Sequence, residues 1–427
     1  MKYKILTLGC KVNQFETQAM ETMLNERGHF PTVDERADAV IVNTCAVTAE
    51  SGRKSRQAVR RLLGENPGAV SAVCGCFSQV SADEVKELGV DIVFGSGDRR
   101  GFVDALEKAF ADRQKTINVD DPFARKYIEP LPSGAMEGRT RAHMKIVDGC
   151  DNYCSYCIIP YARGHVRSMP VSDCAAEAAR LHGEGYKEIV VTGIEISSYG
   201  ADLEGKPGLG EAIKAIALAA PDSRIHIGSI EPTVINDDFC RMLRELGNVC
   251  PHFHLALQSG CDKTLKNMNR KYDTARFYSA VELLRVYFPD CALSCDLIVG
   301  FPGETEEDHA EAMAFIKKCN FASMHIFPYS IRPGTAAAAM PGHLTNAVKS
   351  ARAREAQTIA AKMQTAYLES MQGRELSALF ETEKDGMWYG HTDNYCEICV
   401  MGENLHGIVK NVHITSISGK KLVGIII

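Results

Sequence analysis

A short stretch near position 150 carries three cysteines at a spacing that suits a metal centre. Cys150, Cys154 and Cys157 form a CxxxCxxC loop directly after a predicted strand. Three thiolates on one loop can hold three irons of a cubane cluster and leave the fourth iron without a protein ligand, free to chelate a substrate. A zinc site, which requires four ligands, and chance in a cysteine-rich chain are the alternatives. The spacing favours the cluster.

Three further cysteines lie far apart in the sequence but in similar local positions. Cys10, Cys45 and Cys76 each follow a predicted strand. Because parallel strands end at the same edge of their sheet, we expect these thiols on a common rim. Cysteines buried without any metal are the alternative. Cys74 is a second candidate for the third position, although the glycine before Cys76 and the glutamine three residues after it favour Cys76.

The overall composition limits the class of protein. Of 427 residues, 45% are hydrophobic and 24% charged, which is ordinary for a soluble globular chain of two or three domains. Sixteen cysteines without a secretion signal indicate metal ligation in a reducing cytoplasm, not a disulfide framework. The formal net charge of −6 argues against bulk electrostatic coating of nucleic acid, so any RNA contact must be a local basic patch. The apolar runs are too short to cross a membrane.

The first hundred or so residues alternate short apolar runs with helix-like stretches, as in a parallel sheet flanked by helices. Predicted strands cover residues 4–8, 39–42, 70–73 and 91–94, and predicted helices cover 14–27, 51–63 and 82–88. The last of these helices should begin with a capping pair of Ser81 and Glu84. The pattern predicts an α/β amino-terminal domain with a flavodoxin-like sheet over residues 1–112.

The rest of the chain divides into three parts. A polar, proline-containing stretch over 113–139 predicts a linker. Six strand-and-helix units follow, with strands over 143–147, 188–192, 224–227, 252–257, 292–299 and 323–327. They predict a central partial (β/α)6 barrel over 140–372, closed by one long helix over 345–372. Short runs rich in Val, Ile, Tyr and Thr then predict a small antiparallel β-barrel over 373–427.

The CxxxCxxC loop, with Tyr156 directly before its third cysteine, resembles that of the radical S-adenosylmethionine superfamily. The resemblance implies a [4Fe-4S] cluster on Cys150, Cys154 and Cys157, whose open iron binds the amino and carboxylate groups of S-adenosylmethionine. One electron from a low-potential donor would split the sulfonium bond and release a deoxyadenosyl radical. The protein's part would be to position and shield that radical.

The three amino-terminal cysteine contexts resemble those of the methylthiotransferases, which implies a second [4Fe-4S] cluster on Cys10, Cys45 and Cys76. The resemblance covers essentially the whole chain, through the runs PYARG (160–164), TGI (192–194), GSIEP (228–232), HLALQSG (254–260), MNRKY (268–272) and DLIVGFPGET (296–305). It implies removal of hydrogen from adenine C2, a position that acid–base catalysis does not easily reach, so no acid–base catalytic residue is expected. A second S-adenosylmethionine would donate the methyl group.

Two segments resemble the MtaB type in particular, CKVNQ at 10–14 and HIFPYSIRPGT at 325–335. This type acts on N6-threonylcarbamoyladenosine next to the anticodon of tRNA. The types that modify isopentenyladenosine in tRNA or a ribosomal-protein aspartate share the chemistry and are alternatives. A non-catalytic iron–sulfur protein that binds RNA or transfers electrons is an alternative of another class, and it would form no deoxyadenosine.

The resemblance also suggests residues that contact the cosubstrate: Tyr156, Ser229, Glu231, Gln258 and Arg270. Polar residues that merely cap neighbouring loops are the alternative. Met169 and Glu195 depart from the family pattern, in which a basic residue and a neutral or histidine side chain are more usual.

Basic residues on the predicted helix after Cys45 form the candidate RNA contact: Arg53, Lys54, Arg56, Arg60 and Arg61. A solvated helix face is the alternative. The segment from about Arg374 resembles a TRAM domain, a small barrel associated with RNA binding, although its acidic residues outnumber its basic ones. Cys396 and Cys399 lie in one strand-like run and are predicted to be structural. We expect a cytoplasmic monomer with no membrane partner.

Overall fold

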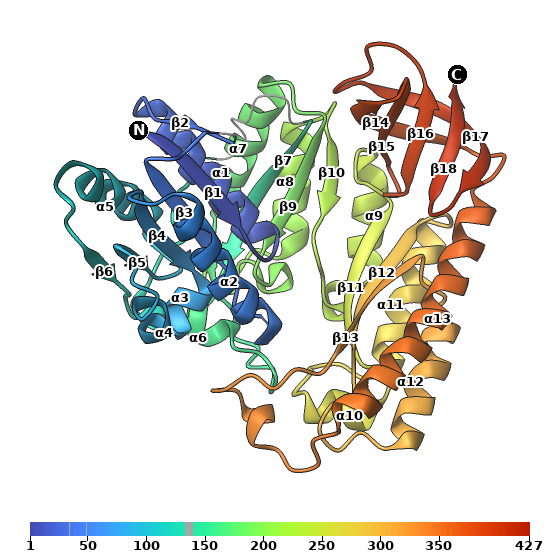
Figure 1. The fold of residues 1–427 in the computed structure, drawn as a ribbon. Coiled ribbons are helices and arrows are strands. Elements are labelled where there is room, and N and C mark those ends of the chain that lie inside the picture. The colour runs from blue at the N-terminus through green and yellow to red at the C-terminus, as the bar shows by residue number, and fades with distance from the viewer. Residues whose placement is uncertain (34, 48, 133–139) are drawn as a thin grey trace.

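The computed structural model describes residues 1–33, 35–47, 49–132 and 140–427. An amino-terminal parallel sheet lies beside a central partial barrel, and a small closed barrel follows at the carboxyl end (Figure 1). This arrangement confirms the predicted α/β fold class. The domain boundaries drawn from the sequence stay predictions. In the described part of the chain, no helix is both long enough and apolar enough to span a bilayer.

The amino-terminal sheet contains six parallel strands in the order β2-β1-β3-β4-β5-β6, which extends the flavodoxin-like order by one strand. The strands are β1 (Lys2–Thr7), β2 (Phe30–Pro31), β3 (Ala39–Thr44), β4 (Val70–Gly75), β5 (Ile92–Phe94) and β6 (Thr116–Asn118). The helices are α1 (Lys11–Glu26), α2 (Ala49–Glu65), α3 (Cys76–Val80), α4 (Ala82–Lys86) and α5 (Arg99–Asp112). Both faces of β3 and β4 are buried, because α1 and α5 cover one side and α2 and α3 the other.

Two local features differ from the sequence-based expectation. Part of the predicted linker, β6, is the edge strand of the sheet and pairs with β5. The sequence did not reveal this strand because three largely exposed residues show too short an alternation of polar and apolar side chains. Ser81 does stand at the start of α4, but its side chain forms no capping hydrogen bond. Glu84 instead forms an ion pair with Arg56 at 2.9 Å. Residues 133–139 of the predicted linker lie outside the described part of the chain.

The central region forms a partial barrel from two sheets, β10-β9-β7-β8 and β11-β12-β13. Its strands are β7 (Arg141–Asp148), β8 (Arg167–Ser168), β9 (Glu188–Gly193), β10 (Arg224–Ile227), β11 (His252–Gln258), β12 (Ala292–Val299) and β13 (Ser323–Pro328). Isolated parallel bridges, Ile225 to Val249 and Ile230 to Leu255, join the two sheets at the β10–β11 seam. All strands but β8 run parallel, as the six predicted units require.

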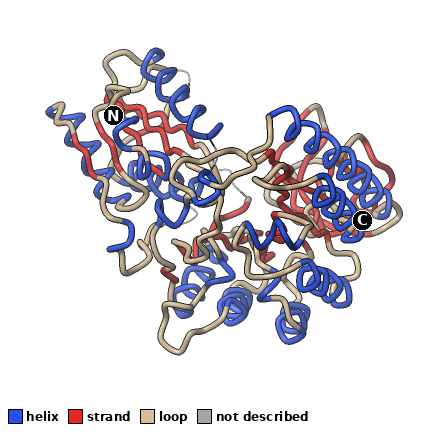
Figure 2. Tube along the Cα trace, turned by 90° about the horizontal axis from the view of Figure 1, so that it is seen from below, coloured by secondary structure: helices blue, strands red, loops and turns tan. Residues whose placement is uncertain are grey.

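Helices surround the outer face of the partial barrel (Figure 2). They are α7 (Val171–Gly183), α8 (Leu209–Ala219), α9 (Asp237–Leu246), α10 (Asp262–Asn267), α11 (Thr274–Tyr287), α12 (Glu306–Cys319) and α13 (Asn346–Ser370), whereas α6 (Ile159–Arg163) packs against the amino-terminal core. Single 3₁₀ turns are η1 (Pro122–Ala124), η2 (Ile196–Ser198), η3 (Pro232–Val234) and η4 (Ala336–Ala339). Alternate strand residues such as Phe253, Leu255 and Leu257 pack outward against these helices. The residues between them, which are largely polar, therefore face inward.

The carboxyl-terminal barrel closes in the order β14-β15-β16-β18-β17. Its strands are β14 (Glu375–Lys384), β15 (Met387–Thr392), β16 (Glu397–Met401), β17 (Val409–Ser418) and β18 (Lys421–Ile426). Four of the five pairings are antiparallel as predicted, and β16 pairs with β18 in parallel. Strand directions cannot alternate all the way around a closed ring of five strands, so one parallel pair is unavoidable.

Gly75 joins β4 to the helix that begins with Cys76, and its φ is +101°. A Cβ at this position would collide with the Thr44 carbonyl oxygen and lie 2.6 Å from Asn43 Oδ1. We expect Gly75→Ala to lower the thermal midpoint of unfolding by roughly 4–8 °C more than Gly89→Ala. Both substitutions place an alanine at a positive φ, but only the new Cβ at position 75 would clash with backbone atoms. Gly89 has a φ of +77° and no described atom within 4 Å of its Cβ position. Equal midpoints for the two variants would contradict this account.

Candidate active site

The structure places Cys10, Cys45 and Cys76 together at the carboxyl edge of the amino-terminal sheet. Cys10 caps the start of α1, Cys45 follows β3, and Cys76 is the first residue of α3. A Cβ on Gly9 would lie only 3.1 Å from Cys45 Sγ, so the glycine permits this close approach. Burial raises the pKa of each thiol, and each thiol also affects the pKa of another member of the set.

Cys74 lies apart from this group. It is fully buried in the core on the α1 and α5 side of the sheet, whereas Cys76 belongs to the opposite side. Burial raises the pKa of Cys74 to about 11, with smaller effects from Arg99, Glu16, Arg163 and Cys76. The geometry therefore favours Cys76 as the third member of the first cysteine set.

Cys150, Cys154 and Cys157 lie on the loop between β7 and α6. Burial, with a smaller contribution from neighbouring thiols of the loop, raises the pKa of Cys150 and raises that of Cys157 to about 12. Cys76 of the first set also raises the pKa of Cys157. The two cysteine sets, separated by more than seventy residues in the chain, therefore lie near one another.

Each cysteine set has an arginine that donates to one of its sulfurs. Arg163 Nε lies 3.2 Å from Cys76 Sγ, and Arg270 Nη1 lies 3.1 Å from Cys154 Sγ. Positive charge at this range favours thiolate, the form that binds iron. Three clustered sulfurs with a compensating buried cation are a donor set that fits an iron–sulfur cluster at each position.

A buried ion network joins the sheet, the barrel and the first cysteine set. Glu16 on α1 accepts from Arg99 at 2.9 Å and from Arg163 at 3.2 Å, and it lies 3.5 Å from Lys145 Nζ. Asp148 continues the network, 3.0 Å from Lys145 and 3.4 Å from Arg163. These neighbouring cations overcome the effect of burial and hold the pKa of Glu16 down at about 2.

Most of the predicted cosubstrate residues gather beside the CxxxCxxC loop. Arg270 pairs with the buried Glu231 at 2.6 Å, and Glu231 also accepts from Asn152 of the loop at 3.0 Å. Tyr156 lies close enough to Cys154 and Arg270 for both to affect its pKa, which burial raises.

The other predicted contacts are placed less distinctively. Gln258 ends β11 with a φ of +64°, at a register shift of the strand pairing. Ser229 is exposed just after β10. Of the two departures from the family pattern, Glu195 caps the η2 turn through the backbone of Ser197, and Met169 packs against the barrel core. Neither side chain needs a ligand to explain its place.

The inner face of the barrel carries a chain of polar contacts that the sequence did not reveal. His226 on β10 lies 2.7 Å from His252 on β11, and Ser294 on β12 contacts both His252 at 3.0 Å and His254 at 2.9 Å. Single histidines at different strands give no signal on their own. Their inward alternation becomes evident only when the strands are aligned.

Lys11, next to Cys10, projects over this face. Its ammonium lies 6.0 Å from the ring centre of Tyr395, a residue of the carboxyl-terminal barrel. The Tyr395 ring in turn stacks on His252, with 5.0 Å between the ring centres. Burial lowers the pKa of Lys11. In the described part of the chain, this face also carries His254, Asp296 and His325, whose possible metal-binding atoms lie within 4.8 Å of one another.

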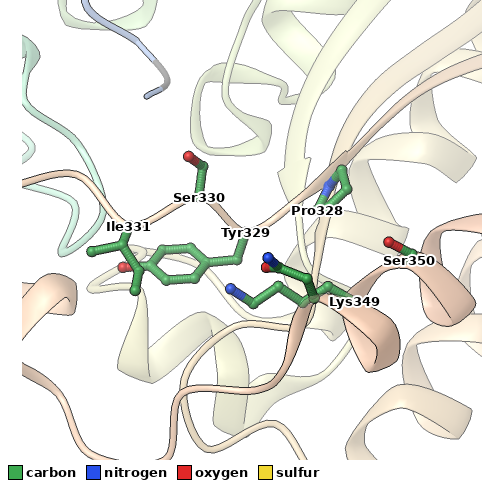
Figure 3. Close-up of a pocket in the computed structure, with 7 residues that line it drawn as sticks. Pro328, Tyr329, Ser330, Ile331, Lys349 and Ser350 are labelled. Atoms are coloured by element: carbon green, nitrogen blue, oxygen red, sulfur yellow. The ribbon is translucent and has the colours of Figure 1, made fainter. Parts of the chain in front are cut away.

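A hollow of about 420 Å³ opens where β13 ends (Figure 3). Its lining residues are Pro328, Tyr329, Ser330, Ile331, Asn346, Lys349 and Ser350. The Lys349 ammonium lies 5.3 Å from the centre of the Tyr329 ring. The hollow lies between the end of β13 and the start of α13 and includes none of the predicted site residues.

The basic helix predicted to contact RNA is α2, which begins just beyond the Cys45 loop. Arg53, Lys54, Arg60 and Arg61 are exposed, whereas Arg56 is half-buried in its ion pair with Glu84. In the carboxyl-terminal barrel, Cys396 and Cys399 are buried along β16, and Cys399 Sγ lies 3.7 Å from the Leu422 carbonyl oxygen. A packing role accounts for that pair.

Comparison with known proteins adds a family to this geometry. Residues 144–316 match the model of the Radical SAM superfamily, and residues 2–95 match that of Uncharacterized protein family UPF0004. The chain is 36% identical over 416 residues to threonylcarbamoyladenosine tRNA methylthiotransferase MtaB of Bacillus subtilis (strain 168). The alignment covers 96% of this chain and 92% of that protein. It is 31% identical over 437 residues to tRNA-2-methylthio-N(6)-dimethylallyladenosine synthase of Pelotomaculum thermopropionicum. This alignment covers 100% of this chain and 97% of that protein.

A solved structure also shares the fold. The radical S-adenosylmethionine methyltransferase TsrM from Kitasatospora setae aligns with a TM-score of 0.59 at 14% identity, covering 79% of this chain and 75% of that one. At this identity the likeness concerns the fold alone.

The Glu16 network yields a stability prediction. Glu16→Gln should destabilise the fold by about 3–5 kcal/mol at pH 7, because it leaves buried cations without their carboxylate. Glu26→Gln, an exposed site on the same helix, should cost less than about 0.5 kcal/mol. Urea denaturation followed by circular dichroism measures both.

The same network predicts an acid dependence. Since the folded pKa of Glu16 is about 2 and its ordinary value is 4.5, its contribution is complete above pH 4.5 and is lost as the pH falls towards 2. The stability gap between wild type and Glu16→Gln should therefore narrow below pH 4.5. A gap that stays constant down to pH 3 would refute the assignment.

Proposed function

This chain belongs to the radical S-adenosylmethionine methylthiotransferases of MtaB type, and we propose that it adds a methylthio group to C2 of N6-threonylcarbamoyladenosine next to the anticodon of tRNA. The single observation that supports this most is the pair of three-cysteine sets brought side by side, with Arg163 reaching from the end of α6, just after the CxxxCxxC loop, to Cys76. A chemistry that needs a radical source and a sulfur donor needs two such centres close together.

Membership of the superfamily implies a [4Fe-4S] cluster and S-adenosylmethionine, and we assign that cluster to Cys150, Cys154 and Cys157. We propose a second [4Fe-4S] cluster on Cys10, Cys45 and Cys76. When bound, these groups supply the radical and the methylated sulfur that the unactivated C2 position requires.

The protein's own residues prepare the site for those groups. Arg163 and Arg270 compensate thiolate charge, and Cys45, Cys76 and Cys150 are buried, which limits the access of water to both centres. Glu231 and Arg270, fixed by their mutual ion pair, are positioned to bind polar groups of the cosubstrate, together with Tyr156, Ser229 and Gln258. We propose that the chain works as a cytoplasmic monomer that draws electrons from a low-potential donor.

The roles of the two cysteine sets can be separated. In the oxygen-free enzyme, the triple change of Cys150, Cys154 and Cys157 to Ala should abolish formation of deoxyadenosine from S-adenosylmethionine. The same change at the first set should spare that cleavage, abolish methylthiolation and reduce the iron content from about eight to about four per chain. Mass spectrometry of products and iron analysis measure these results.

Cys174→Ala, in the outer barrel core, is the matched control and should keep both products. If a folded variant of the first set also failed to cleave S-adenosylmethionine, the proposed division would be wrong. Nucleosides from cells that lack this protein should in turn lose the methylthio form and retain the unthiolated adenosine.

RNA binding should depend on the exposed face of α2. The double variant Lys54→Gln, Arg60→Gln should weaken binding of an anticodon stem-loop roughly tenfold and reduce the slope of log affinity against log salt by about 1.5, because two phosphate contacts are lost. Lys108→Gln, Lys214→Gln removes the same charge from exposed sites on α5 and α8 and should change neither quantity. Equal slopes for both double variants would exclude α2 as the contact.

A further inference from the structure

The two segments that carry the MtaB resemblance approach one another on the inner face of the barrel, although more than three hundred residues separate them. Lys11 stands at the start of α1, and His325 lies on β13. The Lys11 ammonium lies 6.0 Å from the ring of Tyr395, which stacks on His252, and the ring of His325 lies 5.6 Å from that of His254 on the same face. Asp296 raises the pKa of His325, and Lys11 is near enough to oppose that effect. The Lys11 side chain therefore extends over the polar face, one residue away from Cys10 of the first cysteine set.

The acidic side chains of this face already have partners. Asp296 lies 3.0 Å from His325 Nδ1 and 3.4 Å from His254 Nε2. Glu188 pairs with Arg224 at 2.6 Å and lies 3.2 Å from His226. In contrast, within the described residues Lys11 has neither a hydrogen-bond acceptor nor an ion-pair partner; the ring of Tyr395 lies 6.0 Å from its ammonium, and Arg141 and Glu188 are near enough to affect its pKa. A ligand anion would give this half-buried ammonium the direct partner that it lacks.

This part of the face is open to a ligand. The His325 side chain, on the edge strand β13, is 65% exposed, and that of Asp296 on β12 is 32% exposed. The face continues to the proposed cosubstrate residues, since His254 and Gln258 alternate inward along the same strand β11. A base whose reacting carbon lies between the two cysteine sets can therefore extend a substituent towards Lys11 and His325.

We propose that Lys11 and His325 bind the carboxylate of the threonylcarbamoyl substituent, with Asp296 orienting the His325 ring. This inference rests on the proposed function and names the residues that select its substrate. Ammonium and imidazolium donate charge-assisted hydrogen bonds to a carboxylate. An isopentenyl substituent offers no acceptor and would leave Lys11 buried without a partner, so the same pair rejects that adenosine.

The test uses the complete enzyme with reductant, S-adenosylmethionine and two anticodon stem-loop RNAs. One RNA carries N6-threonylcarbamoyladenosine, and the other carries its carboxamide, which has the same shape without the charge. For wild type, we expect a dissociation constant and a KM about 30-fold higher for the carboxamide, with a smaller change in kcat. Lys11→Gln should raise both constants about 30-fold for the acid and bind acid and carboxamide within about threefold of each other.

Two further variants make the outcome decisive. Lys108→Gln, the same change on the exposed face of α5, should keep the wild-type preference. His325→Gln lies far in sequence from every cysteine of the two sets and should reduce the preference even if Lys11→Gln loses iron.

The possible failures are distinct. If wild type thiolates the acid and the carboxamide equally well, or if both Lys11→Gln and His325→Gln keep the preference, this inference is overturned while the proposed function stands. If wild type thiolates neither RNA, the proposed function fails, and this inference fails with it.

Discussion

The buried carboxylate of Glu16 is the interaction on which the relation between the two halves of the molecule depends. It stands on α1 of the amino-terminal domain and binds Arg99 of the same domain, yet it also holds Arg163 and lies near Lys145, which belong to the barrel. Four buried charges at one point are costly unless each keeps its partners, so the arrangement tolerates little relative movement. The positions of the two cysteine sets are thereby fixed with respect to each other.

Arg163 connects this network to the chemistry. The same guanidinium that pairs with Glu16 donates to Cys76 Sγ, and it also contacts Asn13, whose amide binds the backbone at Leu8 and Thr44. The strand ends that carry the first cysteine set are therefore tied to the helix that follows the second set. The contacts of Arg163 therefore compensate the charge on Cys76, hold the strand ends beside it and set the distance between the two cysteine sets.

The carboxyl-terminal barrel completes the inner face of the central one. Tyr395, held at a φ of +63°, stacks between His252 and His391, while Arg141 pairs with Glu381 at 2.7 Å. Aromatic and ionic contacts thus close the partial barrel at the end where β7 and β10 begin, opposite the CxxxCxxC loop. The domain contributes to the shape of the site as well as to any contact with RNA.

The sequence by itself determined the fold class, because the period-two and helical patterns of a parallel α/β chain are local: the six barrel strands and α13 were found within one or two residues of their ends. It also identified the family, and it singled out the two sets of cysteines that the fold brings near one another. It missed β6 and overestimated the Ser81 cap, since such short features depend on their neighbours. Only the tertiary structure decided that Cys76 and not Cys74 faces the other thiols, that Arg163 at the end of α6 reaches Cys76, and that Lys11 extends over the inner face of the barrel. Such contacts between distant segments arise from the packing of elements and leave no periodic trace in the chain.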